Sequence, residues 1–242
     1  MQLLILDAGH AEKVAGKRNE KQNFFEWKFN DEMQYKIKKR AEEHGITVYL
    51  TNPNPKGIDE IGLAKRSTLA NNYWTKNNKP KAIFISLHGN AVDNASVRGT
   101  ETYHAKNAST TSKNFAKTLN DEIVKTMKSL DKNAKDRGVK SENFTVIYKA
   151  SMPSVLVEYA FYSNLDDLKI LKNNKDELVE ATVKAICSYF GIEYKEKAKE
   201  EVKFDSNLYA VCVGAYKDKN KANSIVEELK KKGYTSTYLI LR

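Results

Sequence analysis

Short apolar runs alternate with amphipathic stretches over the first 190 residues of the chain. Residues 3–6 and 82–87 are almost wholly apolar, which is typical of strands that are buried on both faces of a sheet. Residues 26–43 instead place apolar side chains at steps of four, which predicts an amphipathic helix. This alternation predicts an α/β fold, with a mainly parallel or mixed sheet that is covered by helices on both faces.

The same reading assigns the remaining elements of this region. It predicts further strands at residues 46–50, 99–104, 144–148 and 154–158, and helices at residues 59–76, 109–130 and 165–190, the last as one helix or two. The apolar side chains of the helix at 59–76 are expected to face inward, and they are Ile61, Ala64, Leu69 and Tyr73.

The character of the sequence changes near Gly191. Residues 1–191 form the larger predicted domain, residues 192–205 are a charged linker, and residues 206–242 form a small βαβ-type module. The module comprises a strand at 207–214, a helix at 218–232 and a strand at 234–241. Units of about 40 residues rarely bury enough surface to fold alone. We therefore expect the module to dock on another surface, and a homodimer formed through it is one solution.

Charge and composition narrow the class of protein. The chain of 242 residues carries 41 Lys and Arg against 31 Asp and Glu, a net charge of +10. The basic residues are scattered, and the clusters at 38–40 and 230–232 lie on predicted helices as solvated faces, so we expect no nucleic-acid partner. No apolar run approaches the roughly 18–20 residues that span a bilayer, so no membrane insertion is expected. Cys187 and Cys212 lie in apolar stretches and are predicted to be buried free thiols.

Candidate chemistry gathers at the predicted strand ends. His10 and His88 each fall at the end of a strand, where an α/β sheet places its site, and together they supply two imidazoles. Zinc hydrolases use three His or carboxylate ligands and leave one position open for water. The third ligand is then a nearby acid, and the candidates are Glu12, Glu20 and Glu26. Glu20 and Glu26 are favoured, and their spacing from the histidines does not decide between them.

Glu158 is the second chemical signal. It follows residues 155–157, an apolar run, and precedes another one at 159–161. An acid in such surroundings costs free energy unless it is paired or functional, and burial raises its pKa toward the range that suits a general acid or base. The alternative is a position at the sheet edge from which the carboxylate reaches solvent.

Six motifs in order resemble one family over about residues 1–190. The chain is similar there to the zinc-dependent N-acetylmuramoyl-L-alanine amidases. Small departures occur at Ala8, Gly89 and Ala160, where the family more often has Pro, Ala and Gly. The motifs are D-A-G-H at 7–10, E-W-K-F-N at 26–30, the segment with Arg66 and Ala70-Asn71, S-L-H-G-N at 86–90, G-T-E-T-Y at 99–103, and M-P-S-V-L-V-E at 152–158 with Phe161 and Ser163-Asn164.

The resemblance implies a function and assigns roles. It implies hydrolysis of the amide between N-acetylmuramic acid and L-alanine in peptidoglycan, with Zn²⁺ held by His10, Glu26 and His88. Glu158 would be the general base. Asn90 would bind substrate or hold His88, and Glu101 would face substrate or form a cross-strand salt bridge. Arg66 is expected to be structural.

The tail has a separate resemblance. Residues 208–234 are similar to one repeat of a SPOR-type peptidoglycan-binding module, which usually contains two repeats.

The alternatives to an amidase are a zinc peptidase that cuts elsewhere in the stem peptide and a non-catalytic peptidoglycan-binding protein. The apolar run at 3–6 ends at Asp7, too short for a signal peptide. We therefore expect synthesis in the cytoplasm and action on the wall after release, an arrangement typical of a phage endolysin or an autolysin.

Overall fold

The computed structural model describes residues 1–14, 16–197, 214 and 216–234. Contacts between Cα atoms divide the chain into two units, Met1–Lys195 and Glu196–Arg242. The first unit contains the candidate chemistry and is described first.

A six-stranded mixed sheet forms the centre of the first unit, as the alternating pattern predicts. Its order is β4-β1-β5-β8-β6-β7, and all neighbouring strands run parallel except β6 and β8. The four strands β4, β1, β5 and β8 therefore end at one edge of the sheet. The strands are β1 (Gln2–Ala8), β4 (Thr47–Leu50), β5 (Lys81–Asn90), β6 (Thr100–His104), β7 (Asp136–Ser141) and β8 (Ser154–Phe161).

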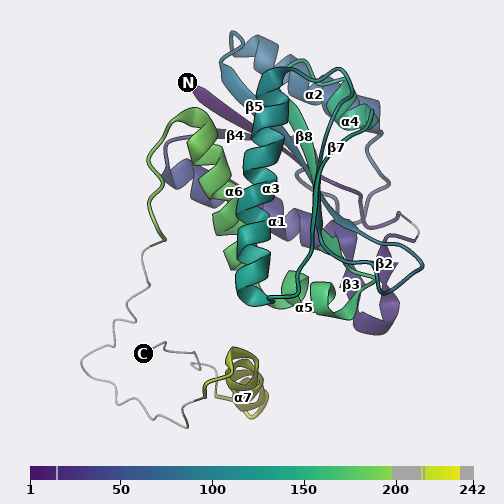
Figure 1. Cartoon of the computed structure of the whole chain (residues 1–242), viewed down its shortest axis with the longest axis vertical. Helices are drawn as coiled ribbons and strands as arrows, with labels where there is room; N and C mark the ends of the chain where they lie inside the picture. The colour runs from purple at the N-terminus through teal and green to yellow at the C-terminus, as the bar shows by residue number, and fades with distance from the viewer. Residues whose placement is uncertain (15, 198–213, 215, 235–242) are drawn as a thin grey trace. The chain divides into compact units, whose positions relative to one another are not determined.

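Helices cover both faces of this sheet (Figure 1). The larger core lies between the sheet and α1 (Glu26–Glu43), α3 (Thr110–Leu130) and α6 (Lys175–Phe190), and the smaller core lies under α2 (Leu63–Lys76) and α4 (Thr145–Tyr148). Leu4 and Leu6 of β1 belong to the first core, whereas Leu3 and Ile5 belong to the second. Because successive side chains of a strand point to opposite faces, a strand between two cores must be apolar throughout.

The short remaining elements lie before α1 and after β8. They are β2 (Arg18–Asn19), the 3₁₀ turn η1 (Glu20–Gln22), β3 (Phe24–Phe25) and α5 (Leu165–Asn173). The region predicted as one helix or two is therefore two, α5 and α6, separated by Asn174.

Between residues 130 and 150 one prediction is wrong and one strand was not predicted. The strand predicted at 144–148 is instead the helix α4 (Thr145–Tyr148) with Phe144 as its N-cap, although β-branched and aromatic residues dominate this segment. Only Val146 and Ile147 are buried there, as neighbours on a single turn, so packing against α2 outweighs strand propensity. The strand β7 has no apolar alternation because it is an exposed edge strand, and for this reason the pattern does not reveal it.

Two predictions about helix faces are also corrected. The helix α2 begins at Leu63 instead of residue 59, with Gly62 as its N-cap, and Ala64 is exposed. Its buried residues are Arg66, Ser67 and Ala70, so a charged side chain occupies the inner face. In the basic cluster at 38–40, Arg40 is buried instead of solvated and forms two hydrogen bonds with the Glu180 carboxylate.

In the second unit, the described residues form one helix. The helix α7 (Lys219–Lys231) lies within the predicted range of 218–232, and the side chain of its N-cap Asp218 accepts hydrogen bonds from two backbone amides. The flanking strands predicted at 207–214 and 234–241 lie outside the described residues except for Gly214 and Tyr234, as does Cys212. Cys187 is a buried free thiol, as expected. Among the helices that the structure describes, none is both long and apolar enough to cross a bilayer.

Candidate metal centre at the carboxyl ends of the strands

Two neighbouring parallel strands bring His10 and His88 together. The strand β1 pairs with β5 in a register that joins Ala8 to Leu87, so the residues that follow meet at the same edge of the sheet. The two imidazole centroids lie 5.0 Å apart, with their planes at 85°. Glu26 reaches the same place as the first residue of α1, where its side chain is buried.

The donor atoms of these three residues form a tight cluster. One ligand atom from each of His10, Glu26 and His88 lies within 4.8 Å of the other two. Glu26 Oε1 is 3.4 Å from His10 Nε2 and 3.0 Å from His88 Nδ1. Two donors bound to one tetrahedral zinc ion stand about 3.3 Å apart, given bond lengths near 2.0–2.1 Å. The donor set and its spacing therefore fit Zn²⁺.

The Glu26 carboxylate is held in its charged form. Burial opposes ionisation of Glu26, but the contacts with His10 and His88 outweigh burial and lower its pKa to about 2. The backbone N–H of Gly89 also donates to Glu26 Oε1, at 3.3 Å. A carboxyl group must be deprotonated to bind a metal. The low pKa therefore keeps Glu26 ready to act as a metal ligand except in strong acid.

The backbone before His10 is shaped around the ring of His88. A Cβ atom on Gly9 would lie 2.2 Å from His88 Cε1, so only glycine leaves room for that ring. His10 itself has φ of 65°, a left-handed conformation that L-residues rarely adopt. Asn30 Nδ2 donates to the Gly9 carbonyl at 3.0 Å, and Asn52 Nδ2 donates to the His10 carbonyl at 3.0 Å. These amides hold the turn in the conformation that presents the imidazole.

Glu60 is a neighbour of the site that the sequence analysis missed. Its Oε1 lies 3.2 Å from His10 Nδ1 and accepts a hydrogen bond of 2.9 Å from Arg66 Nη2. Arg66 is fully buried and also donates to Asp7 Oδ2 at 3.0 Å, contacts that are consistent with the structural role predicted for it. No sequence signal could have found Glu60, because residues 59–62 read as the start of a helix, whereas they form the loop before α2.

Glu158 lies beside the cluster on the next strand. The register of β5 and β8 pairs it with His88, and the register of β6 and β8 pairs it with Glu101. Its Oε2 atom is buried and makes no hydrogen bond to any part of the chain that the structure describes. Burial, and then the charges of Glu26 and Glu101, raise its pKa well above the ordinary value. A carboxyl group whose pKa is raised in this way is suited to accept and release a proton during catalysis.

Glu101 and Asn90 are coupled to each other. The Glu101 carboxylate is buried and accepts hydrogen bonds from Asn90 Nδ2 at 2.7 Å and from the Tyr103 hydroxyl at 2.7 Å. It also pairs with Arg137 at 2.6 Å and with Lys140, both on β7. This geometry matches the cross-strand salt bridge, and a substrate-binding role for Asn90 and Glu101 stays a prediction.

The other candidates lie away from the cluster. Glu12 Oε2 accepts a hydrogen bond from the backbone N–H of Gly57 at 2.6 Å, and the exposed Glu20 pairs with Arg18 at 3.7 Å. Asn90 makes no hydrogen bond to His88 within the range 16–197, since its Oδ1 accepts from the backbone N–H of Ala91. Of the three acids weighed as the third donor, the fold brings only Glu26 to the two histidines.

An α/β sheet that carries a His–Glu–His cluster at its strand ends, beside a buried acid, defines the class of candidate metallohydrolases. Residues 4–188 match the family model Amidase_3, described as N-acetylmuramoyl-L-alanine amidase, and the chain therefore belongs to this family.

Several curated relatives are similar to the chain. The sporulation-specific N-acetylmuramoyl-L-alanine amidase of Bacillus subtilis is 25% identical over 199 residues, which cover 82% of this chain and 69% of the relative. The endolysin of Bacillus phage SPP1 is 28% identical over 210 residues, which cover 84% and 71%. The amidase LytC of Bacillus subtilis is 36% identical over 111 residues, but the match spans only 21% of LytC and 45% of this chain.

Solved structures show the same fold. The catalytic domain of CwlV, an amidase from Bacillus (Paenibacillus) polymyxa var. colistinus, superposes with a TM-score of 0.67 at 26% identity and covers 80% of this chain and all of that one. An N-acetylmuramoyl-L-alanine amidase from Clostridium difficile 630 gives a TM-score of 0.67 at 27% identity, with 78% and 96% covered.

Proposed function

We propose that the chain is a zinc-dependent amidase that hydrolyses the bond between N-acetylmuramic acid and L-alanine in peptidoglycan. The observation that carries the proposal is the cluster of His10, Glu26 and His88 donor atoms, within 4.8 Å of one another and next to Glu158 across the strands. Membership of the amidase family supports the substrate, since the family is named for this bond.

The three clustered residues would hold the metal. His10 Nε2, His88 Nδ1 and Glu26 Oε1 are the atoms that lie closest together, and Glu26 is ionised over the whole physiological range. Zinc, when bound, lowers the pKa of a coordinated water and polarises a carbonyl group. The Glu60 carboxylate lies 3.2 Å from His10 Nδ1 without a hydrogen bond to it, and its charge would favour a proton on that nitrogen and so leave Nε2 for the metal.

Glu158 would move the proton. In its carboxylate form it accepts a proton from the attacking water, and in its acid form it delivers that proton to the leaving amine of L-alanine. Burial and the charges of Glu26 and Glu101 raise the pKa of Glu158 well above its ordinary value, so its acid form is more accessible than that of an exposed glutamate, and one side chain would serve both steps. The cross-strand pairing of Glu158 with His88 places it on the strand beside the metal ligands.

The test combines metal analysis with product analysis. We expect purified full-length protein to contain about one zinc per chain and to release soluble material from purified wall with a free L-alanine amino terminus. His88→Ala should lose both properties. New amino termini at another residue would indicate a peptidase, and wall binding without any release would indicate a binding protein. Metal-free protein that retains full activity would refute the zinc site.

A further inference from the structure

The first unit has a cavity at the opposite end of the sheet from the metal centre. Its volume is about 650 Å³, and it lies where β5 and β8 begin, near Lys81 and Pro153. His88 comes seven residues after Lys81 on the same strand, so the two places are about 23 Å apart at 3.3 Å per residue. A ligand in this cavity would leave the metal centre accessible.

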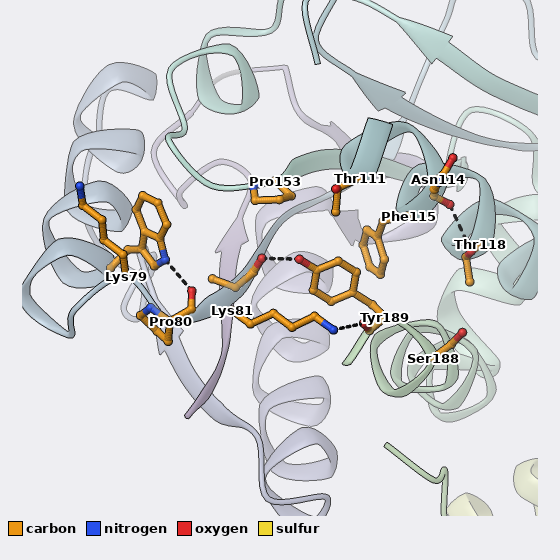
Figure 2. A pocket seen from close by; sticks show the side chains of 12 residues that line it. Lys79, Pro80, Lys81, Thr111, Asn114, Phe115, Thr118, Pro153, Ser188 and Tyr189 are labelled. Carbon is orange, nitrogen blue, oxygen red and sulfur yellow. Dashed lines mark hydrogen bonds between the residues drawn. The ribbon is translucent and has the colours of Figure 1, made fainter. Parts of the chain in front are cut away.

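Aromatic rings and lysines line this cavity (Figure 2). The rings belong to Trp74, Phe115 and Tyr189, and internal hydrogen bonds hold two of them. Trp74 Nε1 donates to the Pro80 carbonyl at 2.8 Å, and the Tyr189 hydroxyl donates to the Ala82 carbonyl at 2.8 Å. Because these polar atoms are already satisfied, the rings are fixed in place before any ligand arrives.

Lys79 and Lys81 carry the charge of the cavity. Lys81 Nζ lies 5.1 Å from the centroid of the Tyr189 ring and donates to the Tyr189 carbonyl at 2.9 Å. Lys79 Nζ lies 5.8 Å from the centroid of the Trp74 ring. Asn78 and Lys79 both adopt left-handed backbone angles, and the N–H of Lys79 donates to the Trp74 carbonyl at 2.9 Å, a turn that returns Lys79 to that ring.

The charge in the cavity is uncompensated. None of the twelve lining residues is an Asp or Glu, and neither lysine forms an ion pair with a carboxylate in the part of the chain that the structure describes. The other polar lining residues are neutral, namely Thr111, Asn114, Thr118 and Ser188. The cavity therefore offers positive charge, aromatic faces and small neutral polar groups together.

We propose that this cavity binds a phosphodiester-linked polyol chain, an anionic polymer of the kind that a bacterial wall can carry. Lysine binds phosphate groups as a compact point charge, and the cavity offers two lysines to the successive phosphates of such a chain. The aromatic faces suit the C–H surfaces of the polyol, and the neutral groups suit its hydroxyls. The physiological context rests on the proposed function, because that function brings the enzyme to the wall.

The direct test is titration calorimetry with a poly(glycerol phosphate) oligomer. The titrated protein is the full-length chain, because the oligomer contains no amide bond that the proposed activity could cut. We expect Lys79→Gln/Lys81→Gln to weaken binding at least tenfold. The matched control is Lys125→Gln/Lys128→Gln, which removes two exposed lysines of α3 outside the cavity and should change affinity less than threefold. If both double variants lost the same affinity, the binding would reflect general charge attraction, and the proposal would be overturned.

Ligand chemistry and hydrolysis complete the test. Polygalacturonate, whose charges are carboxylates, and neutral dextran should bind at least tenfold more weakly than poly(glycerol phosphate); equal binding of either would overturn the assignment. Wall stripped of phosphodiester polymer should be hydrolysed equally by wild type and Lys79→Gln/Lys81→Gln, which also shows that the variant folds. On intact wall the variant should have a higher KM. Loss of activity on stripped wall in the wild type would contradict the proposed function and leave the calorimetric result standing.

Discussion

At the scale of the residue, Glu158 combines a functional position with an energetic cost. Its buried Oε2 has no hydrogen-bond partner between residues 16 and 197, and its pKa is raised by burial and by two neighbouring carboxylates. A folded-state pKa above the unfolded value of about 4.5 means that the folded protein binds the proton more tightly. Folding stability therefore falls as pH rises from that value through the folded-state pKa.

The substitution Glu158→Gln separates these two effects. We expect hydrolysis of purified wall to be lost, because an amide cannot accept the proton, while zinc content stays at the wild-type level. We expect the zinc-free variant at pH 7 to be more stable than zinc-free wild type by about 1–3 kcal/mol, since the unpaired carboxylate is gone. Urea unfolding and zinc analysis check both statements, and normal turnover in the variant would remove Glu158 from the mechanism.

The raised pKa of Glu158 also predicts the pH dependence of activity. The carboxylate is the form that accepts a proton, so kcat/KM should fall as the pH is lowered through that pKa, with a midpoint above 4.5. Zinc content measured at each pH separates this titration from loss of the metal. A midpoint at or below 4.5 with zinc still bound would contradict the assignment.

Gly9 makes a second prediction at this scale. Gly9→Ala places a Cβ 2.2 Å from the His88 ring, so that ring must move, and we expect zinc affinity to fall by about tenfold or more. Gly89→Ala is the matched control, because its Cβ would meet nothing closer than 3.4 Å, at Tyr162 Cδ1. Competition with a chromogenic chelator measures both. Equal affinities in the two variants would show that the close approach of Gly9 has no role.

At the scale of the element, a buried charge network joins β1, β5 and α2. Asp7 is fully buried and accepts hydrogen bonds from Thr51 and Ser86 as well as from Arg66 of α2. Removing one partner of a buried ion pair leaves the other charge uncompensated. The network therefore ties the loop before α2, which carries Glu60, to the strand that leads into His10.

Arg66→Met tests this network. We expect it to destabilise the protein by about 3–5 kcal/mol, and the double variant Asp7→Asn/Arg66→Met to cost less than the sum of the single ones. Lys117→Met breaks the exposed pair with Asp121 on α3 and should cost less than about 1 kcal/mol. Chemical denaturation of the four variants gives these differences. Additive losses at Asp7 and Arg66 would show that the pair is not coupled.

The elements also show how far sequence patterns reach. The helix α1 was predicted with both its ends, because Phe29, Met33, Ile37 and Ala41 are all buried on one face. The two histidines were proposed because each follows a strongly apolar run, whereas the choice of Glu26 over Glu20 came only from the resemblance to the amidase family. Glu60 was missed because its role depends on a loop conformation, and β7 was missed because an exposed edge strand has no buried face to leave an apolar pattern.

At the scale of the whole molecule, the excess positive charge is spread along the chain roughly in proportion to length. Residues 1–199 carry eight of the ten excess positive charges. A basic surface attracts an anionic wall at long range, and salt screens this attraction over about 3 Å at 1 M against 10 Å at 0.1 M. We expect the fraction of protein bound to purified wall to fall when NaCl is raised from 0.05 M to 0.5 M. Unchanged binding would show that the excess charge has no part in wall association.

The helix α7 bears on the predicted homodimer. Its apolar side chains Ala222, Ile225, Val226 and Leu229 share one face, and within the described part of the helix only Ala222 is buried. Burial of this face against a second tail would supply the apolar contact that a module of about 40 residues lacks alone. Light scattering at micromolar concentration should then give about twice the chain mass of 27.5 kDa. Val226→Glu should return the mass to that of one chain, whereas Lys221→Glu, outside this face, should leave the dimer intact. A single-chain mass for the wild type would rule out pairing through the tail at these concentrations.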